Sequence, residues 1–148
     1  MSTFTRQTEI SAPVSAVWAA LADIGNIATW NPGVIESHNT TAETTGLGAC
    51  RYCDLGGKNY LHEEVVAYEP ENRITMRITE TNLPFQQADI QFDLQPAGDH
   101  TLVSVSPMYK IKYGPLGSLM DLVMVRRTYA QGMDNLLAGL KDYVESRQ

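Results

Sequence analysis

The chain has 148 residues, 43% of them hydrophobic and 19% charged, with a formal net charge of −6. This length and balance predict one globular domain over residues 1–148 that is large enough to bury a core. All of the net negative charge lies in residues 1–114, and no basic patch is apparent, which argues against nucleic acid or an anionic membrane surface as a partner.

The start of the chain predicts one strand followed by two short helices. Residues 4–11 alternate between apolar and polar side chains, as a half-buried strand does. Pro13 suits the first turn of a short amphipathic helix, which residues 14–21 form. Asp23 is a good cap for a second brief helix that runs to Trp30 and is closed by the Asn-Pro-Gly sequence at 31–33.

Turn signals divide the middle of the chain into six further strands. Paired glycines at 46 and 48, and again at 56 and 57, separate stretches in which apolar and polar residues alternate. A loop at 81–87 and a turn at 96–99 precede the last two strands. The six predicted strands are residues 34–43, 49–55, 59–68, 73–80, 88–94 and 103–111.

The last third of the chain, residues 114–148, changes to a helical period. Six apolar residues recur at steps of three and four along one stripe, which Gly132 and Gly139 alone interrupt: Leu122, Val125, Tyr129, Met133, Leu136 and Leu140. A helix of about thirty residues is roughly 45 Å long. The order of strand, two helices, six strands and long helix predicts an α+β fold in which this helix crosses the concave face of a seven-stranded, curved antiparallel sheet.

Five stretches of sequence, in this order, resemble the START-like or helix-grip superfamily (SRPBCC), specifically its polyketide cyclase/dehydrase branch. They span nearly the whole chain: 10–18 (ISAPVSAVW), 30–34 (WNPGV), 46–51 (GLGACR), 64–73 (EVVAYEPENR) and 132–140 (GMDNLLAGL). The resemblance implies a helix-grip fold with a ligand cavity between the sheet and the terminal helix. Because the superfamily includes cyclases, lipid and hormone binders and chaperones, the fold alone does not choose a function.

The acid of greatest interest is Glu64, in the fourth predicted strand. Alternation puts it on one face with His62, Val66 and Tyr68, so a carboxylate and an imidazole would share an apolar face. Such a carboxylate would suit a general base or a hydrogen-bond acceptor. The other register turns Glu63 inward and Glu64 to solvent. The resemblance favours Glu64, because hormone receptors of the superfamily use the glutamate at this motif position inside their cavity.

Arg51 alternates with Cys53 and Leu55 in the third predicted strand, which gives one guanidinium on a mostly apolar face. Burying it unpaired is costly, so it requires a carboxylate such as Glu64 or a ligand anion. A ligand anchor and a purely structural ion pair are equally compatible with this pattern. Cys53 is predicted to line the cavity as a small apolar group. Cys50 lies three residues earlier and points to the opposite face, so the C-x-x-C pair is not expected to bind metal or act in redox chemistry.

No metal or cofactor is expected. The three histidines are scattered without metal-binding spacing, and the glycine turn at 46–48 leads into a strand, whereas a phosphate loop leads into a helix. The chain has no signal-type start and no apolar run near twenty residues, so we expect a cytoplasmic protein without stable membrane insertion. Both a monomer and a dimer are compatible with the sequence.

The terminal helix and the loops supply further cavity candidates. Val125, Tyr129 and Met133 lie at the less leucine-rich end of the stripe, where mixed side-chain sizes favour an open space. Ordinary core packing is the competing interpretation of these side chains. An amide after the second helix, a phenylalanine in a gate loop at 81–87 and a phenol in the last strand complete the predicted wall: Asn31, Phe85 and Tyr109.

The leading hypothesis is that the chain binds or carries a small hydrophobic or aromatic ligand in this cavity, fixed by Arg51, Glu64, Tyr109 and Tyr129. The alternative is a cofactor-independent enzyme of polyketide cyclase/dehydratase type, with Glu64 or His62 as general base and Tyr109 as a candidate acid. A third interpretation is a protein-interaction or co-chaperone-like module whose interior has collapsed.

Overall fold

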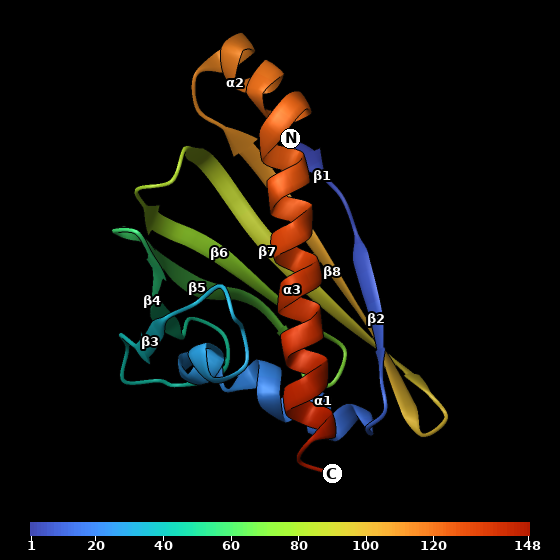
Figure 1. The fold of residues 1–148 in the computed structure, drawn as a ribbon. Helices are drawn as coiled ribbons and strands as arrows, with labels where there is room; N and C mark the ends of the chain where they lie inside the picture. Colours follow the sequence, from blue (N-terminus) through green and yellow to red (C-terminus); the bar gives the residue numbers. More distant parts are fainter.

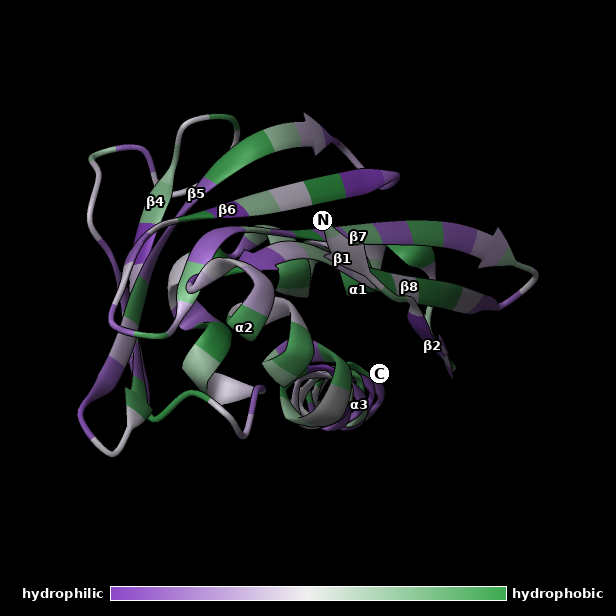
Figure 2. Ribbon diagram, turned by 90° about the horizontal axis from the view of Figure 1, so that it is seen from above, coloured by the Kyte–Doolittle hydropathy of each residue, from purple (hydrophilic) through white to green (hydrophobic). Residues whose placement is uncertain are grey.

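The computed structural model describes the backbone of residues 1–148 and every side chain except that of Val123. One antiparallel sheet forms a layer, the C-terminal helix lies across its concave face, and two short helices lie near the end of that helix (Figure 1). Viewed from above, the sheet curves around the C-terminal helix (Figure 2). This arrangement confirms the predicted α+β helix-grip fold.

The sheet has the strand order β1-β8-β7-β6-β5-β4-β3. Strands β1 and β2 both pair with β8. Residues 4 and 5 interrupt the ladder, so these two short strands take the place of the single strand predicted at the N-terminus. The strand bounds are β1 Ser2–Thr3, β2 Arg6–Ile10, β3 Glu36–Asn39, β4 Cys50–Gly56, β5 Asn59–Glu69, β6 Arg73–Thr81, β7 Phe85–Ala97 and β8 His100–Ile111.

Strand β3 is much shorter than the predicted strand over residues 34–43. After β3 the chain enters a turn in which the Thr41 hydroxyl accepts the Cys50 N–H at 3.0 Å, so a side chain replaces a ladder contact. Gly46 and Gly48 follow with φ values of 86° and 87°, which glycine adopts at no steric cost. Local side-chain hydrogen bonding and turn geometry therefore end this edge strand early.

Three helical elements match the prediction in kind. Helix α1 (Val14–Ala22) buries Val17, Trp18 and Leu21, and the 3₁₀ helix η1 (Ile24–Thr29) follows it directly. The terminal helical segment consists of α2 (Gly114–Met120), a π-helical turn η2 (Asp121–Val125) and α3 (Arg126–Glu145). Met133, Leu136 and Leu140 are buried on α3, as the apolar stripe predicts.

The π turn breaks the uninterrupted helix that the sequence predicts. An i→i+5 turn carries one residue more than an α-helical turn, so it rotates the preceding residues about the helix axis. As a result Asp121 is only 8% exposed and points inward, whereas Leu122, predicted on the inner stripe, is 77% exposed. The inner stripe of apolar side chains therefore begins at Val125 and not at Leu122.

Gly139 permits the closest contact between α3 and the N-terminal part of the fold. A Cβ atom at this position would lie 2.0 Å from the Trp30 carbonyl oxygen and 2.9 Å from Pro32 Cδ. Gly132, by contrast, has no atom within 4 Å of its ideal Cβ position. The two glycines that interrupt the stripe thus differ: the first faces open space, and the second lets α3 pack directly on the chain around Trp30.

Candidate functional site

A cavity of about 460 Å³ lies between the concave face of the sheet and the first turns of α3. Its volume falls within the range of small-molecule sites. The exposed residues Met124, Thr128 and Gly132 belong to its wall, so the cavity reaches the surface along η2 and α3. Most of the wall is apolar and comes from the sheet, including Leu55, Leu61, Met76, Ile78, Ile90 and Phe92.

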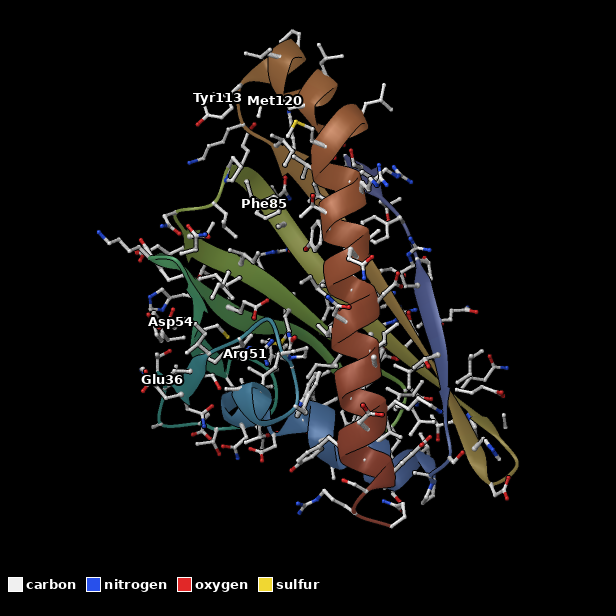
Figure 3. All side chains as sticks on the ribbon, viewed as in Figure 1. Glu36, Arg51, Asp54, Phe85, Tyr113 and Met120 are labelled. Carbon is white, nitrogen blue, oxygen red and sulfur yellow. The ribbon has the colours of Figure 1, made fainter. Side chains whose placement is uncertain are left out.

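A buried ion pair between Arg51 on β4 and Glu63 on β5 forms the charged part of the wall. Glu63 Oε1 accepts Arg51 Nε at 2.9 Å and lies 2.8 Å from Nη2, and the side chains are 6% and 4% exposed. Arg51 Nη1 donates to the Ile24 carbonyl at 3.1 Å. Each guanidinium nitrogen therefore has a protein partner, while Glu63 Oε2 accepts no hydrogen bond from the described residues. Figure 3 labels Arg51 in the half of the molecule away from α2.

The inward-facing acid is Glu63, which corrects the preference for Glu64. Glu63 is 3% exposed and lines the cavity, whereas Glu64 and His62 are only partly buried and do not line it. His62 instead lies 3.7 Å from Glu80 and packs its ring against Tyr52 on the other face of the sheet. The predicted pair of His62 and Glu64 is therefore not part of the cavity.

A β-bulge explains why alternation pointed to the wrong acid. Val65 pairs with Met76 and Tyr68 pairs with Ile74, so three steps along β5 match two steps along β6. The extra residue reverses which side chains face inward. Tyr68 therefore packs on the core, against Trp18, although Glu64 on the same parity faces outward. One uninterrupted alternation through the strand would place Glu64 on the same face as Tyr68, and this is why the sequence favoured Glu64 as the inward-facing acid.

Four aromatic rings close the end of the cavity nearest α2. Tyr129 and Phe85 line the cavity with ring centroids 5.6 Å apart, and Tyr109 and Phe4 pack behind them. Burial, together with the Glu63 charge, raises the pKa of Tyr129, so this phenol stays protonated. Val125 and Met133 complete the wall beside it, as predicted.

Tyr109 lies behind the wall, which corrects its assignment as a cavity residue. The side chain is fully buried, and its hydroxyl donates to Asp121 Oδ1 at 2.5 Å. Ser2 Oγ donates to the second oxygen of the same carboxylate. Burial and this hydrogen bond raise the pKa of Tyr109, which keeps the hydroxyl a donor. Tyr109 therefore fastens the π turn to β8 and presents no group to a ligand.

We expect Tyr109→Phe to reduce the free energy of unfolding by about 1–3 kcal/mol, because Asp121 loses a buried hydrogen-bond donor. Affinity for a cavity ligand should stay within about twofold of the native value, since the hydroxyl is not on the wall. Urea denaturation measures the first quantity and ligand titration the second. A large loss of affinity at unchanged stability would contradict this assignment and return the hydroxyl to the ligand site.

The remaining predicted wall residues do reach the cavity. Asn31, Cys53 and Phe85 all line it, and Leu83 and Pro84 from the predicted gate loop lie beside Phe85 in the wall. Figure 3 labels Phe85 much nearer to α2 than Arg51 is. Asn31 Oδ1 accepts the Gly33 N–H at 2.9 Å, which holds its amide at the end of η1. The loop at 83–85 and the turn after η1 thus border the same cavity.

Among the described residues, no group of three or more histidine, cysteine, aspartate or glutamate side chains is placed to hold a metal ion. The two cysteines are free: Cys53 is buried in the wall and Cys50 is partly exposed. Separately, none of the helices in the described part of the chain has both the length and the apolar character needed to cross a bilayer.

Comparison with known families gives a match over residues 1–145 to the family described as polyketide cyclase / dehydrase and lipid transport. The chain belongs to this family. No curated protein matches the chain at a significant level. The match extends over all five stretches whose resemblance to this branch the sequence indicates.

Solved structures share the fold of this polyketide cyclase/dehydrase family member at low identity. TTHA0849 from Thermus thermophilus is 20% identical with a TM-score of 0.82, and a START superfamily protein from Mycobacterium smegmatis is 17% identical with the same score; each comparison covers 99% of both chains. The ginseng major latex-like protein 151 from Panax ginseng is 14% identical, with a TM-score of 0.76 and 96% coverage of both chains. These similarities establish the helix-grip fold.

Two features of this family member's site were absent from the predicted set. The sequence named Glu63 only as the inward-facing acid of the alternative register. Its Cα partner across the sheet is Arg51, and a carboxylate opposite a guanidinium on an inner face favours an ion pair between them. The apolar wall from β6 and β7 was visible as alternating residues but was not assigned to the cavity. Alternation does not distinguish a side chain that lines a cavity from one that packs against another side chain.

The two cysteines of this family member should differ in reactivity. Burial raises the pKa of the Cys53 thiol to about 12, and Cys53 is only 1% exposed, so almost none of it is a reactive thiolate at pH 8. We expect a thiol reagent to label Cys50 in the folded protein and Cys53 only after unfolding, as peptide mass spectrometry would report. Equal labelling rates in the folded state would contradict a buried Cys53.

Proposed function

We propose that the chain binds a small, mainly hydrophobic molecule that is neutral and carries a hydroxyl or N–H group. The observation that carries this proposal is the cavity of about 460 Å³, apolar along most of its wall and with one buried ion pair in it. A cavity of this kind excludes water from apolar surface and fixes orientation through few polar groups. The family description, which includes lipid transport, supports the same class of ligand.

The ion pair sets which polar group the ligand presents. Arg51 is charge-neutralised by Glu63, and each of its nitrogens already has a protein partner. Three of the five Arg51 N–H groups are directed at Glu63 Oε1 or the Ile24 carbonyl, and Glu63 Oε2 has no donor among the described residues, so the pair keeps one unfilled carboxylate oxygen. A ligand hydroxyl satisfies it, whereas a ligand carboxylate would bring a second negative charge next to Glu63.

Catalysis of the cyclase/dehydratase type requires proton-transfer groups that reach the ligand. Two of the three candidates, His62 and Glu64, lie outside the cavity wall, and the hydroxyl of Tyr109 is bound to Asp121. Glu63, held by Arg51, and Tyr129, a protonated phenol, are the titratable oxygen groups left on the described wall. Binding or carriage is therefore the function that these groups support best. An interior of this volume also argues against a collapsed interaction module.

A series of three probes of the same shape tests the choice of polar group. We expect 2-naphthol to bind more tightly than naphthalene, and naphthalene more tightly than 2-naphthoate, as measured by fluorescence titration at pH 7. A hydrogen bond to a charged acceptor contributes about 1.5–3 kcal/mol, which corresponds to roughly tenfold to a hundredfold in affinity. Tightest binding of 2-naphthoate would contradict the proposal and identify Arg51 as an anion anchor.

Filling the cavity tests where the ligand binds. Gly132 lines the cavity and has no atom within 4 Å of its ideal Cβ position, so Gly132→Leu should occupy the space with little strain and lower 2-naphthol affinity more than tenfold. Ala138→Leu is the matched control, since it adds the same side chain to the same helix at an exposed position outside the wall. Equal affinity of the two variants would place the ligand elsewhere.

A further inference from the structure

Residues 113–124, from the residue before α2 into η2, expose an unusual concentration of large apolar side chains, which we call the apolar tip. Five such residues within twelve positions are more than half exposed: Tyr113 65%, Leu116 62%, Leu119 59%, Leu122 77% and Met124 65%. Single exposed apolar residues are common on protein surfaces, but a contiguous group of this size marks an interaction site. In Figure 1, α2 projects beyond the edge of the sheet, at the end of the molecule opposite α1.

The fold turns these side chains outward by fixing a polar one inward. Asp121, the only acidic residue of the segment, is held in the interior by the hydroxyls of Tyr109 and Ser2. A surface helix ordinarily presents its charged residues to water and buries its apolar ones. The apolar tip does the reverse, because the carboxylate occupies the inner face and the leucines before and after it remain outside.

Basic side chains flank the apolar tip on both sides. Lys110 and Lys112 precede it, Arg126 and Arg127 follow it, and all four are exposed. Residues 110–127 therefore carry a net charge of +3, whereas the whole chain carries −6. This local reversal is hidden in the overall composition, which is why the sequence argued against an anionic membrane surface. Apolar side chains surrounded by lysine and arginine are the pattern of interfacial membrane-binding segments.

The apolar tip is continuous with the mouth of the cavity. Met124 is 65% exposed and also lines the cavity, together with the adjacent Val125. The Lys112 N–H donates to the Pro84 carbonyl at 2.9 Å, which attaches the base of the tip to the loop at 83–85, another part of the cavity wall. A surface that contacts this tip therefore lies directly beside the cavity opening.

We propose that the apolar tip docks reversibly on anionic phospholipid bilayers, so that the cavity exchanges its ligand with the membrane. Docking follows from the tip alone, and the exchange step rests on the proposed function. A second copy of the chain fits the surface less well, because a symmetric contact would bring two segments of charge +3 together with no exposed acidic residue in either. An anionic lipid surface complements both the leucines and the four basic residues.

Vesicle flotation tests the docking. The purified protein should float with vesicles made of equal parts phosphatidylglycerol and phosphatidylcholine at low salt, and binding should fall at least tenfold with pure phosphatidylcholine or high salt. The double variant Leu116→Ser/Leu119→Ser should lose at least tenfold, as should Lys112→Glu/Arg127→Glu. Leu47→Ser, a change at a residue that is 70% exposed but outside the tip, should float like the native protein.

The outcomes separate docking from ligand binding. Gly132→Leu should float normally while failing to bind 2-naphthol, so failure of the proposed function leaves the docking result unchanged. Absence of flotation with anionic vesicles, or equal flotation of Leu116→Ser/Leu119→Ser, would overturn the proposal. Light scattering supplies the remaining comparison: a dimer that the same double variant abolishes would identify the apolar tip as a self-association surface and would also overturn it.

Discussion

Glu63→Leu is expected to lower the free energy of unfolding by about 3–5 kcal/mol, because it leaves the buried Arg51 guanidinium without a counter-charge. The side chains of both residues are almost fully buried, so solvent does not replace the lost partner. Arg51→Met should also lower the free energy of unfolding, because it leaves the Glu63 carboxylate buried without a counter-charge and removes the donor to the Ile24 carbonyl. Urea denaturation of each variant measures both losses.

The double variant Arg51→Met/Glu63→Leu should recover most of that stability, because it replaces a desolvated ion pair with apolar side chains that suit the surrounding wall. It should also lose the preference for 2-naphthol over naphthalene while still binding both probes. The double-mutant cycle thus separates the pair's structural role from its ligand role. If the loss of unfolding free energy in the double variant equals the sum of the losses in the two single variants, the two side chains do not interact.

Gly139→Ala is the second substitution with a large expected effect. Its methyl group would lie 2.0 Å from the Trp30 carbonyl oxygen, which belongs to the backbone and has little freedom to move. Helix propensity favours alanine by about 1 kcal/mol, but the overlap forces α3 away from the turn around Trp30, and we expect a net loss of about 1–3 kcal/mol. Since α3 also forms one wall of the cavity, the same shift should weaken ligand binding.

Gly132→Ala is the matched control for this prediction. It makes the same change in the same helix at a position with open space around the new methyl group, so stability should rise by about 0.5–1 kcal/mol. Thermal unfolding of the two variants side by side checks the difference. If both variants gain stability, α3 does not approach the Trp30 backbone as closely as the structure indicates.

The fold was largely predictable because long, regular segments carry strong patterns. The alternation in β4, β7 and β8 and the buried stripe of Met133, Leu136 and Leu140 follow from periods of two and 3.6. Arg51 and Cys53 were placed correctly on the inner face because β4 contains no bulge between them. Where the backbone is regular, the sequence alone identifies which side chains face the concave side of the sheet.

Two errors in the direction of side chains come from single-residue irregularities. The bulge in β5 exchanged Glu63 for Glu64, and the π turn exchanged Asp121 for Leu122 as the inward residue. Each adds one residue and so reverses or rotates every side-chain direction on one side of it. Such irregularities are stabilised by partners distant in sequence, as Asp121 is by Ser2 and Tyr109, and no local pattern records them.

Native mass spectrometry of the purified protein, before and after organic extraction, tests the central claim of a ligand-binding cavity most directly. We expect a bound mass that extraction removes, and a neutral hydrophobic compound with a hydroxyl or N–H group in the extract. The same mass should be missing from Gly132→Leu and present in Ala138→Leu. A bound mass that persists in Gly132→Leu, or a protein that retains no small molecule and takes up none of the naphthalene probes, would contradict it.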